Sequence, residues 1–228
     1  MAEKTDVLII GAGQAGLAAS SELARRGIDH VVLERDRIGQ SWRTLWNSFC
    51  LVTPNWFIRL PGGTYDGPEP DGYLPRDAIV AFLERYAASV HPRSAKAWRS
   101  RRLCLRPPGL WVHTSAGDLC ARAVVVATGT YRRPYRPPKA FPPRRAGDRR
   151  VRLPRCGIAS GRRRSGHRSW QTGCQIAEEL HGGGREVVLA CGRAPWAPRR
   201  VEVRDIVRWL VETPFLDQSI ADLPTSAA

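Results

Sequence analysis

Short apolar runs flank one glycine-rich turn near the start of the chain. Residues 7–10 read Val-Leu-Ile-Ile, a continuous apolar run that predicts a parallel strand covered on both faces. Residues 17–26 are rich in Ala, Leu, Glu and Arg and stop before Gly27, which predicts a helix capped by that glycine. A second apolar run at residues 30–33 ends at Glu34. The pattern therefore predicts a strand–helix–strand unit.

The turn between the first strand and the helix carries a dinucleotide-binding pattern. Gly11, Gly13 and Gly16 form G-x-G-x-x-G, and Glu34 follows Gly16 by 18 residues. In such a unit Gly11 permits the tight turn, Gly13 lets a pyrophosphate approach the backbone, and Gly16 lets helix and strand pack closely. The N–H groups of the helix start attract phosphates, and Glu34 can accept hydrogen bonds from ribose hydroxyls. The pattern predicts a dinucleotide site, whereas the glycines alone would also suit a surface turn.

Further apolar patterns extend the prediction. Residues 103–105, 110–114 and 119–126 read as a three-stranded meander, with Pro-, Gly- and Asp-containing turns between them. Two helical core faces are predicted from Ile79, Val80, Phe82, Leu83, Tyr86 and Ala87 and from Ile206, Val207, Trp209 and Leu210.

The first unit is partly repeated later in the chain. At an offset of 157 residues, Gly16 falls on Gly173 and Leu23 falls on Leu180. Two such units predict two dinucleotides, as in flavin enzymes that a nicotinamide reduces. The position equivalent to Glu34 is neutral and is soon followed by Arg193, which favours a 2′-phosphate and hence NADPH. The alternative is that Arg193 is only a solvated loop charge.

The repeat fails before residue 171. The strand positions 164–167 read Arg-Ser-Gly-His, and the first two glycine positions hold Arg168 and Trp170. Residues 142–170 carry ten arginines and one aspartate, which is +9 of the net charge of +15. With few apolar residues, this segment is expected to lack a fixed structure. Its composition suggests a reading-frame shift, with a sequencing error or true divergence as the alternatives.

Taken together, these segments resemble the bacterial flavin-containing monooxygenase-like FAD/NAD(P)-dependent oxidoreductases. The resemblance rests on GAGQAG with Glu34, on GQSWR, on WNSFCLVTPNWFIRLPG, on YLPRDAIVAFLERYA, on VVVATGTYRRPYRP, on QTGCQIAEELH and on CGRAPWAPRRVEVRDIVRWL. It implies an α/β, Rossmann-like, three-layer fold for two dinucleotides with a β-meander. It also implies that the C-terminal part of the fold is missing. The expected domains are an FAD-binding domain at 1–141, the Arg-rich segment at 142–170 and a partial NAD(P)-binding domain at 171–228.

The resemblance also assigns candidate site residues. Asn55 matches the region of an asparagine that assists oxygen chemistry in related enzymes, although a structural turn asparagine is the simpler reading of Asn55. The implied cofactor-binding residues are Gly11, Gly13, Gln14, Ala15, Gly16, Glu34, Arg35, Trp42, Arg43, Thr128 and Gly129 for FAD, and Gly173 and Arg193 for NADPH.

The implied reaction is hydride transfer from NADPH to FAD followed by oxygen transfer from O₂ to a small-molecule substrate. We expect this activity to be impaired, because the second glycine motif is broken and the family's C-terminal part is absent. Three alternatives stay open: a catalytically silent flavoprotein fragment, a flavin disulfide reductase, and an Arg-mediated nucleic-acid binder. A disulfide reductase is less favoured because the six cysteines form no C-x-x-C pair.

Composition and residue spacing also give expectations about the cellular location and about metal binding. Scattered cysteines and the lack of a signal-peptide pattern predict a cytoplasmic protein with reduced thiols. No apolar run reaches the ~18 residues of a membrane span. The five histidines show no metal-ligand spacing, so no metal is expected. The sequence leaves the oligomeric state open.

Overall fold

The computed structural model of the chain describes residues 3–92, 94–96, 98–129, 165–168, 171–190 and 198–219. By their contacts, these residues divide into two units. The first draws on Met1–Cys50, Arg59–Thr64 and Leu74–Ser160, and the second on Leu51–Ile58, Tyr65–Tyr73 and Gly161–Ala228. Two loops of the N-terminal half thus group with the C-terminal part, and the domain bounds expected from the sequence stay a prediction.

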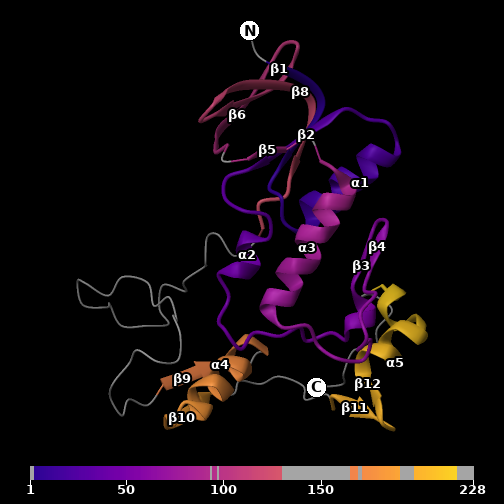
Figure 1. The fold of residues 1–228 in the computed structure, drawn as a ribbon, viewed down its shortest axis with the longest axis vertical. Helices are drawn as coiled ribbons and strands as arrows, with labels where there is room; N and C mark the ends of the chain where they lie inside the picture. The colour runs from indigo at the N-terminus through magenta and orange to yellow at the C-terminus, as the bar shows by residue number, and fades with distance from the viewer. Residues whose placement is uncertain are drawn as a thin grey trace, which may run out of the picture. The chain divides into compact units, whose positions relative to one another are not determined.

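A six-stranded sheet organises the first unit, in the order β5-β2-β1-β8-β7-β6 (Figure 1). Strand β1 pairs in parallel with β2 and β8, and β2 pairs in parallel with β5. Strand β7 lies antiparallel to both β6 and β8, which forms the predicted meander. The strands are β1 (Glu3–Ile10), β2 (His30–Glu34), β5 (Ser94–Lys96), β6 (Ser100–Arg106), β7 (Gly109–Thr114) and β8 (Gly117–Val126), with a small hairpin of β3 (Arg59–Leu60) and β4 (Gly63–Thr64). The predicted Rossmann-like α/β fold is confirmed.

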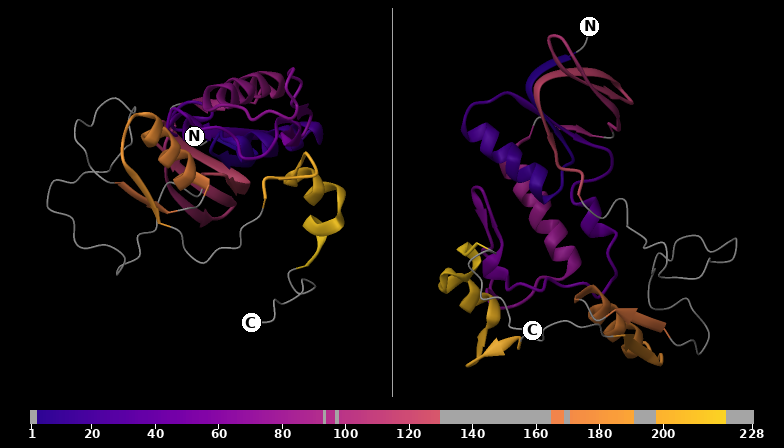
Figure 2. Two further views of the ribbon diagram at one scale, coloured as in Figure 1. Left: turned by 90° about the horizontal axis from the view of Figure 1, so that it is seen from below. Right: turned by 180° about the vertical axis from the view of Figure 1, so that it is seen from behind.

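The described residues of this unit form the helices α1 (Gln14–Arg25), α2 (Gln40–Arg43) and α3 (Arg76–Val90). Helix α1 ends as predicted at Gly27, whose φ is 66° and whose N–H donates to the carbonyl of Ala24 at 3.0 Å. The N–H of Ile28 donates to the carbonyl of Leu23 at 3.0 Å and completes this C-terminal cap. Helices α1 and α3 lie side by side in both Figure 1 and Figure 2.

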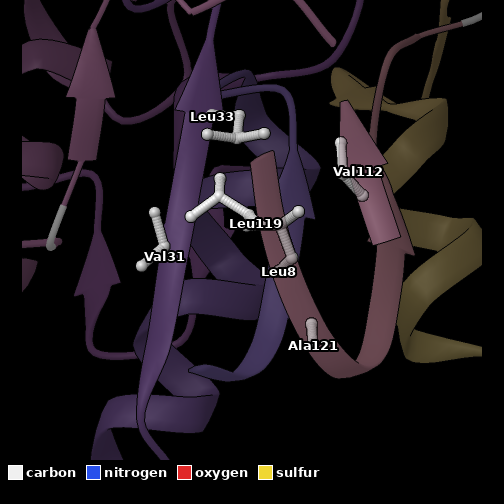
Figure 3. Packing of buried hydrophobic residues seen from close by; sticks show 6 residues of the cluster. All are labelled: Leu8, Val31, Leu33, Val112, Leu119 and Ala121. Atoms are coloured by element: carbon white, nitrogen blue, oxygen red, sulfur yellow. The ribbon is translucent and has the colours of Figure 1, made fainter. Parts of the chain in front are cut away.

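The main core of the first unit lies where the meander meets the parallel strands. Its buried members are Leu8, Val31, Leu33, Val112, Leu119 and Ala121, whose side chains are drawn in Figure 3. Each fully buried Leu or Val contributes about 1.5–3 kcal/mol to stability. On the helices, the predicted core face of α3 is confirmed, since all six predicted residues (Ile79, Val80, Phe82, Leu83, Tyr86 and Ala87) are buried.

The second unit contains a strand–helix–strand fragment and a separate hairpin with its helix. The fragment consists of β9 (Ser165–Arg168), α4 (Gln171–Gly182) and β10 (Val187–Ala190), with β9 and β10 paired in parallel. The hairpin consists of β11 (Arg200–Val201) and β12 (Arg204–Asp205), and it is followed by α5 (Ile206–Glu212) and the short helix η2 (Pro214–Asp217). A further short helix, η1 (Asn55–Phe57), lies in the loops from the N-terminal half.

Strand β9 differs from the expectation that residues 142–170 have no fixed structure. Ser165 pairs with Val187 and Arg168 pairs with Ala190, so the four residues of β9 form a parallel ladder with those of β10. The reason is that ladder hydrogen bonds come from backbone groups, which every side-chain type except proline leaves available. The other residues of the Arg-rich segment lie outside the described residues.

Helix α5 also differs from the sequence pattern. Its predicted core face (Ile206, Val207, Trp209 and Leu210) is only half-buried, and no residue of this helix is fully buried. A seven-residue helix next to a hairpin of two-residue strands finds little apolar surface to pack on. None of the helices in the described part of the chain has the length and apolar character that crossing a membrane requires.

Candidate functional site

The three glycines of the first unit play different parts in its turn. Gly11 has a φ of 112°, and a Cβ atom there would lie 2.4 Å from the carbonyl oxygen of Ala127. A Cβ at Gly16 would lie 1.9 Å from the carbonyl oxygen of Gly11. A Cβ at Gly13 would meet no atom of the described residues within 4 Å. Gly11 and Gly16 are therefore required by the fold itself, whereas Gly13 faces open space.

The open space at Gly13 lies at the N-terminus of α1. Gly13 is the N-cap residue, and it has no side chain with which to cap the helix. Gln14 and Ala15, the first helical residues, are exposed. The first N–H groups of a helix lack intrahelical partners and carry partial positive charge, which suits them to bind phosphate.

Glu34 holds the same turn from the neighbouring strand. Its Oε2 accepts a hydrogen bond from the N–H of Ala12 at 2.8 Å, and its Oε1 accepts one from the N–H of Asp36 at 2.9 Å. Each carboxylate oxygen has two acceptor sites, so both can accept a further bond from a ribose hydroxyl. The bonds to Ala12 and Asp36 were not predicted, because backbone donors leave no residue-type signal in a sequence.

The end of β8 lies beside the glycine turn. The N–H of Ala127 donates to the carbonyl of Ile10 at 2.9 Å, and the Cα of Thr128 lies 3.5 Å from the position of a Cβ at Gly11. Gly129 follows with a φ of 78°, a conformation that favours glycine. The structure thus brings Gly11 and Thr128, two predicted site residues from distant segments, to one place.

The predicted arginines of this unit have partners within the protein. Arg35 forms an ion pair with Asp36 at 2.7 Å. Arg43 pairs with Glu84 of α3, and its Nε donates to the carbonyl of Ile38 at 3.3 Å. Each positive charge is therefore compensated by a carboxylate of the chain, which weakens the case for either arginine as the main phosphate ligand.

Trp42 belongs to a small aromatic cluster. Its ring lies 5.7 Å from that of Phe49 in an edge-on arrangement, and the ring of Trp46 lies 5.1 Å from Phe49. The Nε1 atom of Trp46 is buried and has no hydrogen-bond partner in the described part of the chain. The Nε1 atoms of Trp56 and Trp111 share this state, so it does not single out Trp46 as a ligand-binding residue.

Asn55 lies in the second unit, where it ties two loops together. Its side chain is buried, with 2% exposure, and its Nδ2 donates to the carbonyl of Glu69 at 2.8 Å. Its backbone N–H donates to the carbonyl of Gly72 at 2.9 Å. A Cβ at Gly72 would lie 3.3 Å from Nδ2, so the loop leaves little room around this amide. These contacts support the structural interpretation of Asn55, and its catalytic role stays a prediction.

The structure describes only one of the two residues predicted to bind NADPH. Gly173 lies in the first turn of α4 and is half-buried. Arg193 lies outside the described residues.

The fold and the glycine turn are typical of flavoproteins with a Rossmann-like FAD-binding domain. Residues 4–40 match the family model described as FAD binding domain. That range contains the glycine turn, α1, β2 and Glu34. The match supports FAD as the predicted cofactor, and the expected domain at 1–141 stays a prediction.

Similar sequences give the resemblance more detail. The chain is 39% identical over 136 residues to an "Uncharacterized oxidoreductase CzcO-like" of Geobacillus kaustophilus. This alignment covers 59% of this chain and 39% of the relative's length. It is 36% identical over 135 residues to the indole-3-pyruvate monooxygenase YUCCA1 of rice, in an alignment that covers 57% of this chain and 33% of the relative's length. These relatives confirm the resemblance to flavin-dependent, monooxygenase-like oxidoreductases. The chain spans about two fifths or less of their length.

Solved structures agree on the fold. A mutant flavin monooxygenase of Stenotrophomonas maltophilia is 25% identical, with a TM-score of 0.67 over 93% of this chain and 64% of that chain. The bacillithiol disulfide reductase of Staphylococcus aureus has a TM-score of 0.72 over 92% of this chain and 64% of that chain, at 15% identity. At this low identity, the second likeness concerns the fold alone.

Proposed function

We propose that this chain binds FAD at the glycine turn and belongs to an NADPH-using, flavin monooxygenase-like oxidoreductase. One observation carries the proposal. Gly13 faces open space at the uncapped start of α1, while Glu34 is fixed beside it by the 2.8 Å bond from Ala12. A site of this kind offers backbone donors for a pyrophosphate and a carboxylate for a ribose, which is what a dinucleotide requires.

In this proposal the residues of the chain bind and orient the cofactor. The open face of Gly13 admits the pyrophosphate, and the N–H groups of Gln14 and Ala15 donate to its oxygens. Glu34 accepts from the ribose hydroxyls, and the backbone at Thr128 and Gly129 borders the turn. When bound, FAD would supply the redox chemistry that couples the oxidation of NADPH to the reduction of O₂, with one oxygen atom entering a small-molecule substrate and the other leaving as water.

The NADPH part of the proposal rests on the second unit. Strand β9, helix α4 and strand β10 repeat the strand–helix–strand order of the first unit. Gly173 in the first turn of α4 and Arg193 beyond β10 are the proposed ligands of the pyrophosphate and the 2′-phosphate. Asn55 is proposed to assist the oxygen chemistry, as the resemblance implies.

A second candidate is a flavoprotein that binds FAD without oxidising NADPH. It is favoured by Arg168 and Trp170 at the positions of the first two glycines in the repeated motif, since a tryptophan side chain obstructs the approach of a phosphate to the backbone. A disulfide reductase finds less support, because the six cysteines of the chain form no C-x-x-C pair.

Two measurements on the purified chain separate these candidates. Visible absorption after incubation with FAD and gel filtration reports cofactor binding. Consumption of NADPH and O₂ by the FAD-loaded chain then reports the oxidoreductase step. FAD binding with NADPH consumption supports the proposal, FAD binding without it supports the silent flavoprotein, and no FAD binding contradicts both.

A further inference from the structure

Two loops of the second unit are joined around Asn55. We call Leu51–Ile58 and Tyr65–Tyr73 the Asn55 loops. The N–H of Trp56 donates to the carbonyl of Pro70 at 2.9 Å, beside the two bonds that Asn55 makes to the second loop. The N–H of Tyr65 donates to the carbonyl of Ile58 at 3.2 Å. The position of the Asn55 amide therefore depends on how both loops are held.

A cluster from the C-terminal part of the same unit contacts one end of the Asn55 loops. The hydroxyl of Tyr73 donates to Oδ2 of Asp205 at 2.6 Å, across 132 residues of sequence. Arg199 forms an ion pair with the same oxygen at 2.8 Å, and its guanidinium lies 4.5 Å from the centre of the Tyr73 ring. Arg199 also donates to the carbonyl of Val52. Both loops are thus bonded to one arginine–aspartate pair.

Asp205 is the centre of this cluster. Its side chain is 10% exposed, and its Oδ1 accepts from the N–H of Val207 at 2.8 Å and so caps α5. A carboxylate at this depth is stable only with donors around it. Asp205 has three of them: a hydroxyl, a guanidinium and a backbone N–H.

A second arginine, which lies on α5, contacts the other part of the loops. Arg208 forms an ion pair with Asp71 at 3.1 Å, and its guanidinium lies 4.9 Å from the centre of the Trp56 ring. Trp56 follows Asn55 directly in the chain. Arg199 and Arg208 therefore make the same two kinds of contact at separate points: each pairs with a carboxylate and lies over an aromatic ring of the loops.

We propose that the segment Arg199–Glu212 is an anchor for the Asn55 loops, with Asp205 as a positioning residue that fixes Asn55 through Tyr73. Charge-assisted hydrogen bonds and arginine–ring contacts restrict both the distance between two groups and their relative orientation. They are therefore suited to fix the position of a loop. The inference rests on the proposed function, in which Asn55 assists the oxygen chemistry. It adds the residues that set the position of Asn55, none of which is near it in the sequence.

Amide hydrogen exchange of the full chain tests the anchor. The variants are Asp205→Asn, which keeps a good helix cap but loses the charge, and Tyr73→Phe, which keeps the ring but loses the hydroxyl. We expect exchange at Asn55 and Trp56 to rise at least tenfold in both, with the amides of α1, α3 and α5 unchanged. Arg204→Lys is the matched control, since Arg204 pairs with Glu212 inside the anchor, at 2.6 Å. Unchanged exchange at Asn55 and Trp56, or an equal rise throughout the chain, would overturn the anchor.

The visible circular dichroism of bound FAD tests the positioning role. Asp205→Asn and Tyr73→Phe are expected to change the flavin bands, whereas Arg204→Lys leaves them as in the parent chain. If the exchange result holds and the flavin bands do not change, Asp205 only stabilises the loops and the positioning role is wrong. If the chain takes up no FAD, the proposed function fails, while the exchange experiment still decides whether the anchor exists.

Discussion

Replacing Gly13 by alanine tests whether this position serves FAD binding or the stability of the fold. A Cβ at Gly13 meets nothing within 4 Å in the described part of the chain, and the φ of −84° suits any residue. The free energy of unfolding should therefore change by less than about 0.5 kcal/mol. The new methyl group points into the space proposed for the pyrophosphate, so FAD should bind at least about tenfold more weakly, a loss of ~1.4 kcal/mol.

Gly16→Ala is the contrasting variant. Its Cβ would lie 1.9 Å from the carbonyl oxygen of Gly11, which no side-chain rotation relieves. We expect the free energy of unfolding to fall by ~1–3 kcal/mol, the usual result of overpacking. Urea unfolding followed by tryptophan fluorescence measures stability, and calorimetric titration with FAD measures affinity. If Gly13→Ala binds FAD as tightly as the parent chain, the assignment of the open space to the pyrophosphate is refuted.

Three further predictions concern other contacts of the first unit. Glu34→Gln should weaken FAD binding by about 1 kcal/mol in the same titration, because a charged acceptor becomes a neutral one. Tyr86→Phe removes the 2.7 Å bond to the carbonyl of Pro61 and should lower the free energy of unfolding by ~0.5–1.5 kcal/mol in urea. The hydrogen bond from Arg26 lowers the pKa of Glu22, so Arg26→Gln should raise that pKa toward its ordinary value in an NMR titration.

The direction of that pKa shift also fixes a pH dependence. Because the folded pKa of Glu22 lies below its ordinary value, the ionised carboxylate favours the folded state above that ordinary value. This contribution is lost as the pH falls through the lowered pKa. Comparing acid unfolding of the parent chain with that of Arg26→Gln checks the sign: a smaller loss of stability in the variant supports it, and a larger loss contradicts it.

The first strand–helix–strand unit could be predicted from the sequence closely. The apolar runs gave β1 and β2, and Gly27 marked the end of α1, since each of these signals acts over a few residues of chain. The meander was predicted for the same reason, because its turns contain the residues that turns require. The structure lengthens these strands by one to four residues at their ends, where pairing depends on the neighbouring strand more than on composition.

Other features depend on contacts that no local pattern encodes. The bond from Ala12 to Glu34 involves a backbone donor, and the contact of Tyr73 with Asp205 joins residues 132 positions apart. Strand β9 was not predicted, because its residues show no apolar pattern and its pairing with β10 depends on backbone groups. Helix α5 was given a buried face by its periodicity, but the structure leaves that face half-buried. Periodicity indicates which side of a helix is apolar, but whether other elements pack on that side depends on the tertiary structure.

The most direct test of the proposed function is a titration of the purified full chain with FAD, followed by calorimetry and by the visible flavin spectrum. The proposed site predicts saturable binding of one FAD per chain that Gly13→Ala weakens at least about tenfold while the protein stays folded. A chain that is folded by circular dichroism and binds no FAD would contradict it.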